Sequence, residues 1–435
     1  MFVIILTVLL VIFLLINLKI YKNIINYLNI FLIMYYLIVI LSSSGRYGFA
    51  VPANQTYGYL LLALVALEFF SVLFMKIKLP VKANKNEETI NIKRLTIIAI
   101  LVSILMIPTT IEGLKILIEQ GFTAVRSAAF SDNTYSSYTK IFLSYILSPL
   151  NKVIFIYSLL DYVKNNKIKL PFVLSIINVL QTVVTLGGRS VILDLILIAV
   201  IIIYEKYNRN ILKILSKNKK IIIVAIILLT IIVVITNNRS LSKKQGFWFN
   251  LYSYYVGSIH LFDVHLQNES VSLLDGEHLL YGKGMLNPIW DISKISLKLI
   301  GIDFGIVTGM ELLNEQVQKY LTVNDGIKMN NNVTFLYVCL RDFDIYGLII
   351  GPAYIALWFA ILYKLYIKLK SAKTDALYYY LVSNLPYFIF EFFLNKTQVI
   401  MTFVFIIIMY KIAYSKNKGE VYEKNKGRSD KNNWI

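Results

Sequence analysis

Residues 2–20 read FVIILTVLLVIFLLINLKI, an almost uninterrupted apolar run. A helix of about 20 such residues is about 30 Å long and crosses the hydrocarbon core of a bilayer. Similar runs recur along the 435-residue chain, which is 57% hydrophobic and only 16% charged. This composition argues against a soluble fold and predicts an all-α, polytopic integral membrane protein.

The apolar runs predict about eleven transmembrane helices. No cationic segment precedes the first run and no small-residue cleavage site follows it, so we expect a retained helix there. The predicted domains are an N-terminal bundle of about eight helices (1–236), a large extracytoplasmic loop (237–344), C-terminal transmembrane helices (345–414) and a basic cytoplasmic tail (415–435). The predicted spans are 2–20, 23–41, 57–74, 95–112, 141–162, 170–185, 191–204, 221–236, 345–365, 376–392 and 398–414.

The formal net charge of +19 follows a pattern that orients membrane proteins, and it does not indicate binding to nucleic acid. Lysines concentrate in alternate connections between the apolar runs, and the positive-inside rule places these connections in the cytoplasm. We therefore expect the N-terminus outside and the C-terminus in the cytoplasm. The abundance of Ile, Lys, Asn and Tyr is typical of an AT-rich bacterial genome and indicates a bacterial plasma (inner) membrane.

Arginines, unlike lysines, concentrate on the predicted outer side. Arg46, Arg126, Arg189, Arg239 and Arg341 fall there, whereas the inner side has Arg94, Arg209 and Arg428. The planar guanidinium binds phosphate oxygens through two parallel hydrogen bonds and keeps its charge under partial burial. The set therefore predicts a site for an anionic lipid headgroup such as a pyrophosphate. The alternative is that each arginine anchors a helix end at the interface or pairs with a carboxylate.

Arg189 lies in a very tight connection, Gly187-Gly188-Arg189-Ser190, between two predicted spans. Glycines let the backbone turn sharply and approach a ligand closely. The helix that begins directly after Arg189 would add its unpaired N–H groups to the binding of an anion. The alternative is a helix hairpin closed by glycines, with Arg189 pointing at lipid headgroups.

Aromatic and ionisable residues flank the long outer loop. In residues 252–263, YSYYVGSIHLFD, Tyr255 and its neighbours could stack on sugar faces or form the aromatic belt of a membrane protein. His260 and Asp263 have helical i, i+3 spacing and are candidates for proton transfer, although a histidine among aromatics is more often structural. Arg341 and Asp342 stand at the mouth of an apolar span, either as site residues or as an ion pair that sets helix depth.

Several motifs of catalysis and metal binding are missing from the sequence. It contains no Walker loop, no His-Glu-x-x-His zinc helix and no Gly-x-Ser-x-Gly elbow. The single cysteine, Cys339, excludes an intramolecular disulfide and has no Cys or His neighbours at metal-ligand spacing. We expect no metal and no cofactor. Ionisable residues are almost absent from the predicted spans, which argues against an ion-coupled transporter.

These features together resemble the Wzy-type O-antigen and capsular oligosaccharide repeat-unit polymerases. The resemblance rests on the layout of spans, on Gly187-Gly188-Arg189 before a helix, on the Tyr254–Asp263 stretch, on Gly284, Pro288 and Trp290 in the outer loop, and on Asn331-x-x-Thr334 followed by Arg341-Asp342-Phe343-x-x-x-Gly347. It covers most of the chain. It implies a fold like that of GT-C-like glycosyltransferases.

The resemblance implies glycosyl transfer at the outer leaflet. The growing polysaccharide on undecaprenyl pyrophosphate would be moved onto a hydroxyl of the next lipid-linked oligosaccharide repeat unit, yielding O-antigen, capsule or exopolysaccharide. Membrane lipid, a chain-length regulator and a flippase are the further partners implied. Guanidinium groups would stabilise the leaving pyrophosphate. The expected site residues are Arg189 and Arg239 as pyrophosphate ligands, Arg126, Arg341, Gly188 and Tyr255 as further substrate ligands, and Asp263, Asp342 or His260 as the catalytic base.

Three other readings remain open at this point. An O-antigen ligase is also an outer-leaflet glycosyltransferase with outer arginines and a large outer loop. A flippase or other transporter of the lipid-linked unit would show polar residues in several spans and inverted repeats. A membrane scaffold or sensor would not need clustered outer arginines.

Overall fold

The computed structural model describes residues 2–23, 26–80, 88–130, 135–188, 190–207, 218–239, 247–267, 279–324, 327–329 and 332–416. Helices account for 81% of these residues, and the strands have at most four residues each. The predicted all-α class is therefore confirmed. The chain divides into two compact units, which are described one at a time.

Five helical stretches are long and apolar enough to cross a membrane, and four shorter apolar helices have 10–17 residues. These helices indicate a membrane protein, as predicted. The long stretches are Phe2–Tyr21, Asn54–Lys76, Ile92–Ala129, Tyr138–Asn165 and Leu336–Leu369. The shorter helices are Tyr27–Ser42, Leu170–Leu186, Ile221–Val234 and Thr397–Ala413.

Of the two other predicted spans, one is a continuous helix and one is interrupted. Residues 191–204 lie in α8 (Ser190–Lys206), which buries the carboxylate residue Asp194. The predicted span 376–392 is interrupted, because α17 (Ala372–Ser383) is followed by the 3-10 turns Leu385–Ile389 and Phe393–Asn395. Pro386 lies in the first of these turns, and proline has no N–H to continue an α-helix.

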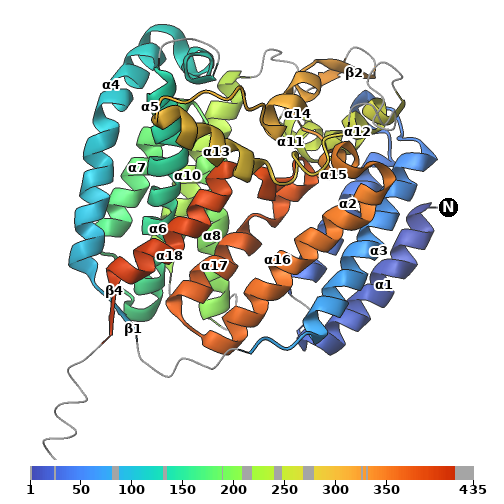
Figure 1. Cartoon of the computed structure of the whole chain (residues 1–435), viewed down its shortest axis with the longest axis horizontal. Helices are drawn as coiled ribbons and strands as arrows, with labels where there is room; N and C mark the ends of the chain where they lie inside the picture. The colour runs from blue at the N-terminus through green and yellow to red at the C-terminus, as the bar shows by residue number, and fades with distance from the viewer. Residues whose placement is uncertain are drawn as a thin grey trace, which may run out of the picture. The chain divides into compact units, whose positions relative to one another are not determined.

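Unit 1 comprises Met1–Leu79, Ile223–Lys364 and Tyr380–Met401. Its helices α1 (Phe2–Tyr21), α2 (Tyr27–Ser42), α3 (Asn54–Lys76) and α16 (Gly347–Leu369) run side by side (Figure 1). Aromatic contacts join α2 to α16, since the rings of Tyr27 and Phe359 stack with their centroids 4.8 Å apart. Aromatic packing of this kind adds about 1 kcal/mol per pair beyond area burial.

Short helices from the predicted outer loop lie together at one end of α2, α3 and α16 (Figure 1). α12 packs against α2, α3 and β2, which places the loop helices directly on the apolar helices of unit 1. They form because aromatic and apolar residues in this segment can bury against the helix ends. The elements of this segment are α11 (Phe247–Tyr255), α12 (Gly257–Gln267), α13 (Asn287–Leu299), α14 (Gly309–Val317), the antiparallel pair β2 (Leu321–Asn324) and β3 (Ile327–Met329), α15 (Leu336–Phe343) and the 3-10 turn Asp344–Tyr346. A further 3-10 turn, Arg46–Gly48, lies between α2 and α3.

Unit 2 comprises Pro80–Ile222, Leu365–Tyr379 and Thr402–Ile435. In it, α4 (Ile92–Phe130) and α7 (Leu170–Leu186) run side by side, and a Cβ on Gly113 of α4 would lie 2.6 Å from the Val184 carbonyl oxygen of α7. The absence of a side chain at Gly113 thus permits this close packing. The elements are β1 (Glu88–Ile90) paired with β4 (Tyr414–Lys416), α4 (Ile92–Phe130), α5 (Ser137–Phe142), the π-turn Leu143–Leu147, α6 (Ser148–Asn165), α7 (Leu170–Leu186) and α8.

Four helices contribute residues to both units: α10 (Lys219–Arg239), α16, α17 and α18 (Thr397–Ala413).

Ionisable residues inside the apolar helices are more numerous than we expected. In unit 2, Lys152 of α6 and Asp194 of α8 form an ion pair with little exposure. In unit 1, Glu68 of α3 is buried. Charged groups within apolar helices are tolerated when they face a partner inside the bundle.

Candidate functional site

A groove with a volume of about 590 Å³ opens in unit 1 between α2 and α11. It is lined by Met34, Leu37, Ile38, Leu41, Arg46, Tyr47, Trp248, Leu251, Tyr252, Tyr255, Val256 and Ile389. Apolar side chains of α2 form one wall, and aromatic side chains of α11 form another. Trp248 is 68% exposed and Arg46 is also exposed, so the groove is accessible from outside the unit. It combines an apolar surface, aromatic faces and one cation.

The turn that carries Arg46 has an unusual backbone. Tyr47 has a φ of 58°, between Gly45 at 58° and Gly48 at 79°. Glycine adopts these angles without steric cost, whereas a side chain as large as tyrosine pays roughly 1–2 kcal/mol for them. The Tyr47 ring packs against Tyr252 with the centroids 5.2 Å apart, which holds the turn against α11. Strain of this kind is concentrated at functional sites.

His260 lies behind the wall of the groove. Its ring is 2% exposed and packs against Phe49, with centroids 4.9 Å apart, and against Tyr252 at 6.4 Å. The backbone of Ala50 lies near this ring, but neither ring nitrogen forms a hydrogen bond of normal geometry with a described residue. Burial lowers the pKa of His260 to about 4, and the charge of Asp263 acts in the opposite direction. The imidazole is therefore neutral at neutral pH.

Asp263 has a structural contact that its sequence position did not indicate. Its Oδ1 accepts hydrogen bonds from the backbone N–H of Ala53 at 2.9 Å and from the Thr56 hydroxyl at 2.6 Å. Ala53 is the N-cap residue of α3, and its own side chain cannot cap the helix. Asp263 thus supplies from α12 the carboxylate that an N-terminus favours, which stabilises α3 by about 1 kcal/mol.

Arg341 and Asp342 lie at the end of α15. The fully buried Asp342 carboxylate accepts backbone hydrogen bonds from Gly284 at 2.8 Å and Met285 at 2.6 Å. The backbone N–H groups of Leu280 and Tyr281 also donate to the carbonyls of Arg341 and Asp342. Asp342 therefore orders the turn that contains Gly284. Arg341 is 8% exposed, and its Nε has no hydrogen-bond partner among the described residues.

Two residues that sequence reasoning missed accompany Arg341. His265 of α12 is fully buried, and its ring lies 4.9 Å from the ring of Tyr337 of α15. Within the described part of the chain, neither imidazole nitrogen nor the Tyr337 hydroxyl has a hydrogen-bond partner. Burial lowers the pKa of His265 to about 4, and the charge of Arg341 contributes in the same direction. No sequence motif indicated this contact, because the residues are 72 positions apart.

The two histidines predict that acid destabilises the fold. Their pKa in the native state is about 4, below the ordinary value of 6.5, so the unfolded state binds more protons between these values. Above about pH 6.5 the histidines are neutral in both states, so their burial does not lower the free energy of unfolding. As pH falls toward 4, the unfolded state takes up protons first and the free energy of unfolding decreases. Thermal unfolding of the detergent-purified protein should show this decline. The double variant His260→Gln/His265→Gln should show a flatter profile, and an unchanged slope would contradict the assignment.

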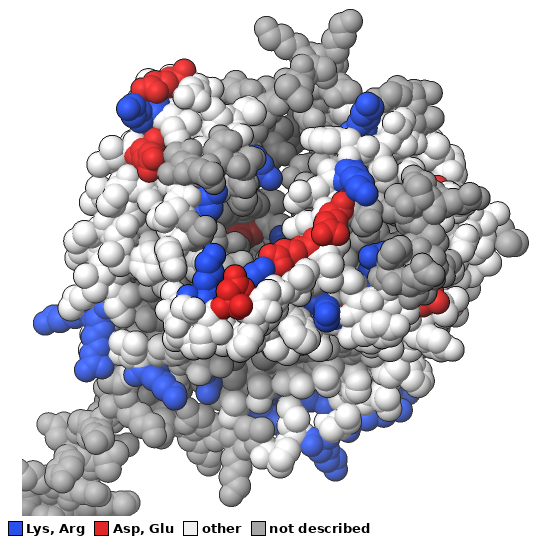
Figure 2. Space-filling model, turned by 45° about the horizontal axis from the view of Figure 1, so that its top comes forward, with Lys and Arg blue, Asp and Glu red and all other residues white. Residues whose placement is uncertain are grey.

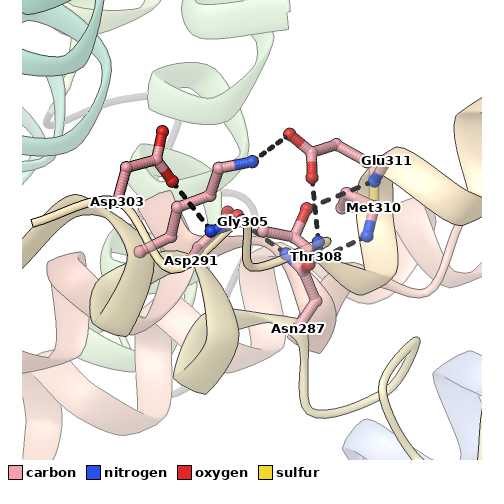
Figure 3. Close-up of polar contacts among 8 residues, drawn as sticks. Asn287, Asp291, Asp303, Gly305, Thr308, Met310 and Glu311 are labelled. Atoms are coloured by element: carbon pink, nitrogen blue, oxygen red, sulfur yellow. Dashed lines mark hydrogen bonds and ion pairs between the residues drawn. The ribbon is translucent and has the colours of Figure 1, made fainter. Parts of the chain in front are cut away.

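Polar contacts hold α13 to α14 in the segment that contains Pro288 and Trp290 (Figure 3). The Asn287 side chain accepts from the Met310 backbone N–H at 2.8 Å and donates to Asp291 at 3.2 Å. Glu311 accepts from the backbone of Thr308 and pairs with Lys294 at 2.6 Å. The Thr397 hydroxyl donates to Asp291, which ties this hairpin to the start of α18. These polar contacts hold the segment. No cluster of three His, Cys, Asp or Glu that could hold a metal ion occurs among the described residues.

In unit 2, the structure brings Arg126 next to the Gly187–Gly188 connection. Gly187 has a φ of 63° and caps α7, and a Cβ there would lie 3.0 Å from the backbone nitrogen of Arg126. The predicted sharp glycine turn is therefore confirmed at Gly187. The exposed Arg126 lies beyond a break in α4 at Gly121, where φ is 84°.

The other predicted arginines are not all described. Arg189 lies outside the described residues, and Arg239 ends α10 while its side chain also lies outside them. The predicted residues that are described fall into two sets. His260, Asp263, Tyr255, Arg341 and Asp342 belong to unit 1, and Arg126 and Gly188 belong to unit 2.

The groove residues Tyr47 and Trp248 were not predicted from the sequence. Tyr47 nevertheless adjoins an outer arginine and lies between Gly45 and Gly48, and glycines are typical of turns.

Comparison with protein-family models, with curated proteins and with solved structures finds no match to this chain. The geometry and chemistry of its own residues therefore carry the functional argument.

Proposed function

We propose that this chain is a glycosyltransferase that polymerises undecaprenyl-pyrophosphate-linked oligosaccharide repeat units into surface polysaccharide. It acts at the outer face of the bacterial plasma membrane, with about eleven spans, a GT-C-like fold, the N-terminus outside and the C-terminus in the cytoplasm. The groove carries this proposal. A lipid-linked sugar needs an apolar surface for its isoprenoid chain, a cation for its pyrophosphate and aromatic faces for its sugars, and the groove offers all three.

The distribution of charge supports the proposed orientation. On the face shown in Figure 2, the lower edge carries basic side chains, whereas acidic and basic side chains occur together on the part that is turned toward the viewer. Lysines close the proposed cytoplasmic ends of helices in unit 1, among them Lys19 of α1 and Lys76 of α3. Basic residues favour the cytoplasmic side of a membrane.

In the proposed reaction, a hydroxyl of the acceptor unit attacks the anomeric carbon of the donor chain. The bond from that carbon to the pyrophosphate oxygen breaks, and the hydroxyl proton passes to a base. Arg46 stabilises the charge that develops on the leaving pyrophosphate, and Tyr255 stacks on a sugar. Arg189 and Arg239 remain predicted pyrophosphate ligands, with Arg126, Arg341 and Gly188 as further ligands.

Asp263, Asp342 and His260 remain the three candidate bases. Oxygens of Asp263 and Asp342 already accept hydrogen bonds from backbone N–H groups of the fold. His260 is neutral, and it packs against Tyr252 in the wall of the groove. A neutral imidazole can accept the proton of a sugar hydroxyl.

The proposal is tested on surface polysaccharide and lipid-linked intermediates from a strain that lacks the gene. We expect loss of the long polysaccharide ladder and accumulation of single repeat units at the outer leaflet. Complementation with the wild-type gene should restore the ladder, and complementation with an Arg189→Ala variant should not. Labelling with a membrane-impermeant sugar oxidant reports on which leaflet holds the units.

Two outcomes would replace the proposal. Repeat units that stay on the cytoplasmic leaflet would identify a flippase. Full-length lipid-linked polymer that is not attached to its final acceptor would identify a ligase.

A further inference from the structure

Three polar side chains meet between the apolar helices of unit 1. Asn17 lies just before the last turn of α1, Asn29 in the first turn of α2, and Glu68 within α3. The Asn17 amide nitrogen donates to Asn29 Oδ1 at 2.9 Å and to Glu68 Oε2 at 3.1 Å. Asn17 and Asn29 are fully buried and Glu68 is 3% exposed. The cluster is therefore cut off from solvent within helices that are otherwise apolar.

Three oxygens of this cluster have no hydrogen-bond partner among the described residues: Asn17 Oδ1, Glu68 Oε1 and Ser71 Oγ. Ser71 lies one turn along α3 from Glu68 and is fully buried. No ion pair joins Glu68 to a described lysine or arginine, although such pairs are formed elsewhere in the chain. An ionised carboxylate in such surroundings carries a desolvation cost of several kcal/mol or more unless a positive charge compensates it.

We propose that Asn17 and Glu68 bind a monovalent cation, either a proton or Na⁺. One hydrogen bond already joins the amide nitrogen of Asn17 to one carboxylate oxygen of Glu68, and the oxygens left over on these two groups are both acceptors. Two acceptors cannot satisfy one another, whereas a cation bound by both oxygens would satisfy both. A proton on Glu68 Oε1 would be donated to Asn17 Oδ1.

The other candidate cation, Na⁺, prefers oxygen ligands. The Ser71 hydroxyl would be a third oxygen ligand beside those of Asn17 and Glu68. In either case the ion joins α1 to α3 and makes their contact depend on cation binding. Both helices are among those long enough to span a membrane, so the site would lie within the bilayer. Intramembrane carboxylates with this property can respond to ion gradients. The inference does not depend on the proposed transferase function.

The test uses the full-length protein purified in detergent. Thermal unfolding is measured in NaCl and in choline chloride of equal ionic strength. Infrared spectra of the same samples report the carbonyl stretch of a protonated carboxylic acid. Glu68→Gln keeps the shape of the side chain and removes its charge. Glu315→Gln, at an exposed position of α14, is the matched control.

If Na⁺ is the ligand, the unfolding temperature of the wild type and of Glu315→Gln rises by several degrees and saturates with Na⁺, while Glu68→Gln does not respond. If a proton is the ligand, Na⁺ has no effect, and the acid carbonyl band is lost only in Glu68→Gln. A wild type with neither Na⁺ dependence nor an acid carbonyl band has an ionised Glu68 without a bound cation, which would overturn the proposal. Both wild-type measurements remain decisive if Glu68→Gln does not fold.

Discussion

If the chain has the proposed function, replacing Arg46 with alanine should lower the rate of polymer formation by roughly 10- to 100-fold. A hydrogen bond to a charged group is worth about 1.5–3 kcal/mol, and each 1.4 kcal/mol changes a rate or affinity tenfold. Arg46 is the cation of the groove, so its guanidinium has no neighbour in the lining that could replace it. The rate is measured with the purified protein in nanodiscs and a lipid-pyrophosphate-linked repeat unit as substrate.

Two further variants test whether charge alone is sufficient and whether the effect is specific to the groove. Arg46→Lys keeps the charge but loses the two parallel hydrogen bonds, and it should recover part of the lost rate. Arg94→Ala removes an exposed arginine that donates to the Ile412 carbonyl in unit 2, and it should leave the rate unchanged. Equal losses in Arg46→Ala and Arg94→Ala would show that the effect is not specific to the groove. An unaffected Arg46→Ala would remove the groove from the site.

Replacing Gly347 with alanine should destabilise the protein by roughly 3 kcal/mol, the upper range for overpacking a tight contact. A Cβ at Gly347 would lie 1.9 Å from the carbonyl oxygen of Cys339, and a Cβ at Gly351 would lie 2.2 Å from the Cys339 sulfur. These glycines are four residues apart on α16 and form a flat surface for α15. Small residues with this spacing allow close helix packing in membrane proteins. Backbone atoms cannot move aside without shifting α15 and the Arg341–Asp342 end that follows.

Gly58 provides the matched control. It also lies inside an apolar helix, α3, but a Cβ there meets nothing within 4 Å. Gly58→Ala should therefore leave stability unchanged or raise it by up to about 1 kcal/mol, because alanine favours the helix. Unfolding temperature and the yield of monodisperse protein in detergent measure both effects. Similar behaviour of the two variants would show that α15 and α16 do not pack as closely as described.

Glu68 and the His265–Tyr337 contact illustrate how residues far apart in sequence acquire their chemistry. Neither belongs to a motif, and each depends on helices that meet only in the folded chain. Glu68 was present within a predicted span, yet its sequence neighbours did not show that Asn17 and Asn29 would surround it. Asp263 and Asp342 are candidate bases from the sequence, but their contacts with the α3 N-terminus and the Gly284 turn were not predictable.

The amino-acid sequence was sufficient to predict an all-α protein of apolar helices, because in a bilayer each backbone N–H and C=O must be satisfied within its own segment. It also determined the sharp turn at Gly187, which depends on one residue's freedom to adopt a positive φ. Three features could be seen only in the folded chain: α2 and α11 enclose a groove, α17 ends early, and Asn17 contacts Glu68. Local conformation follows from the properties of neighbouring residues, whereas these features depend on contacts between distant segments that side-chain packing alone selects.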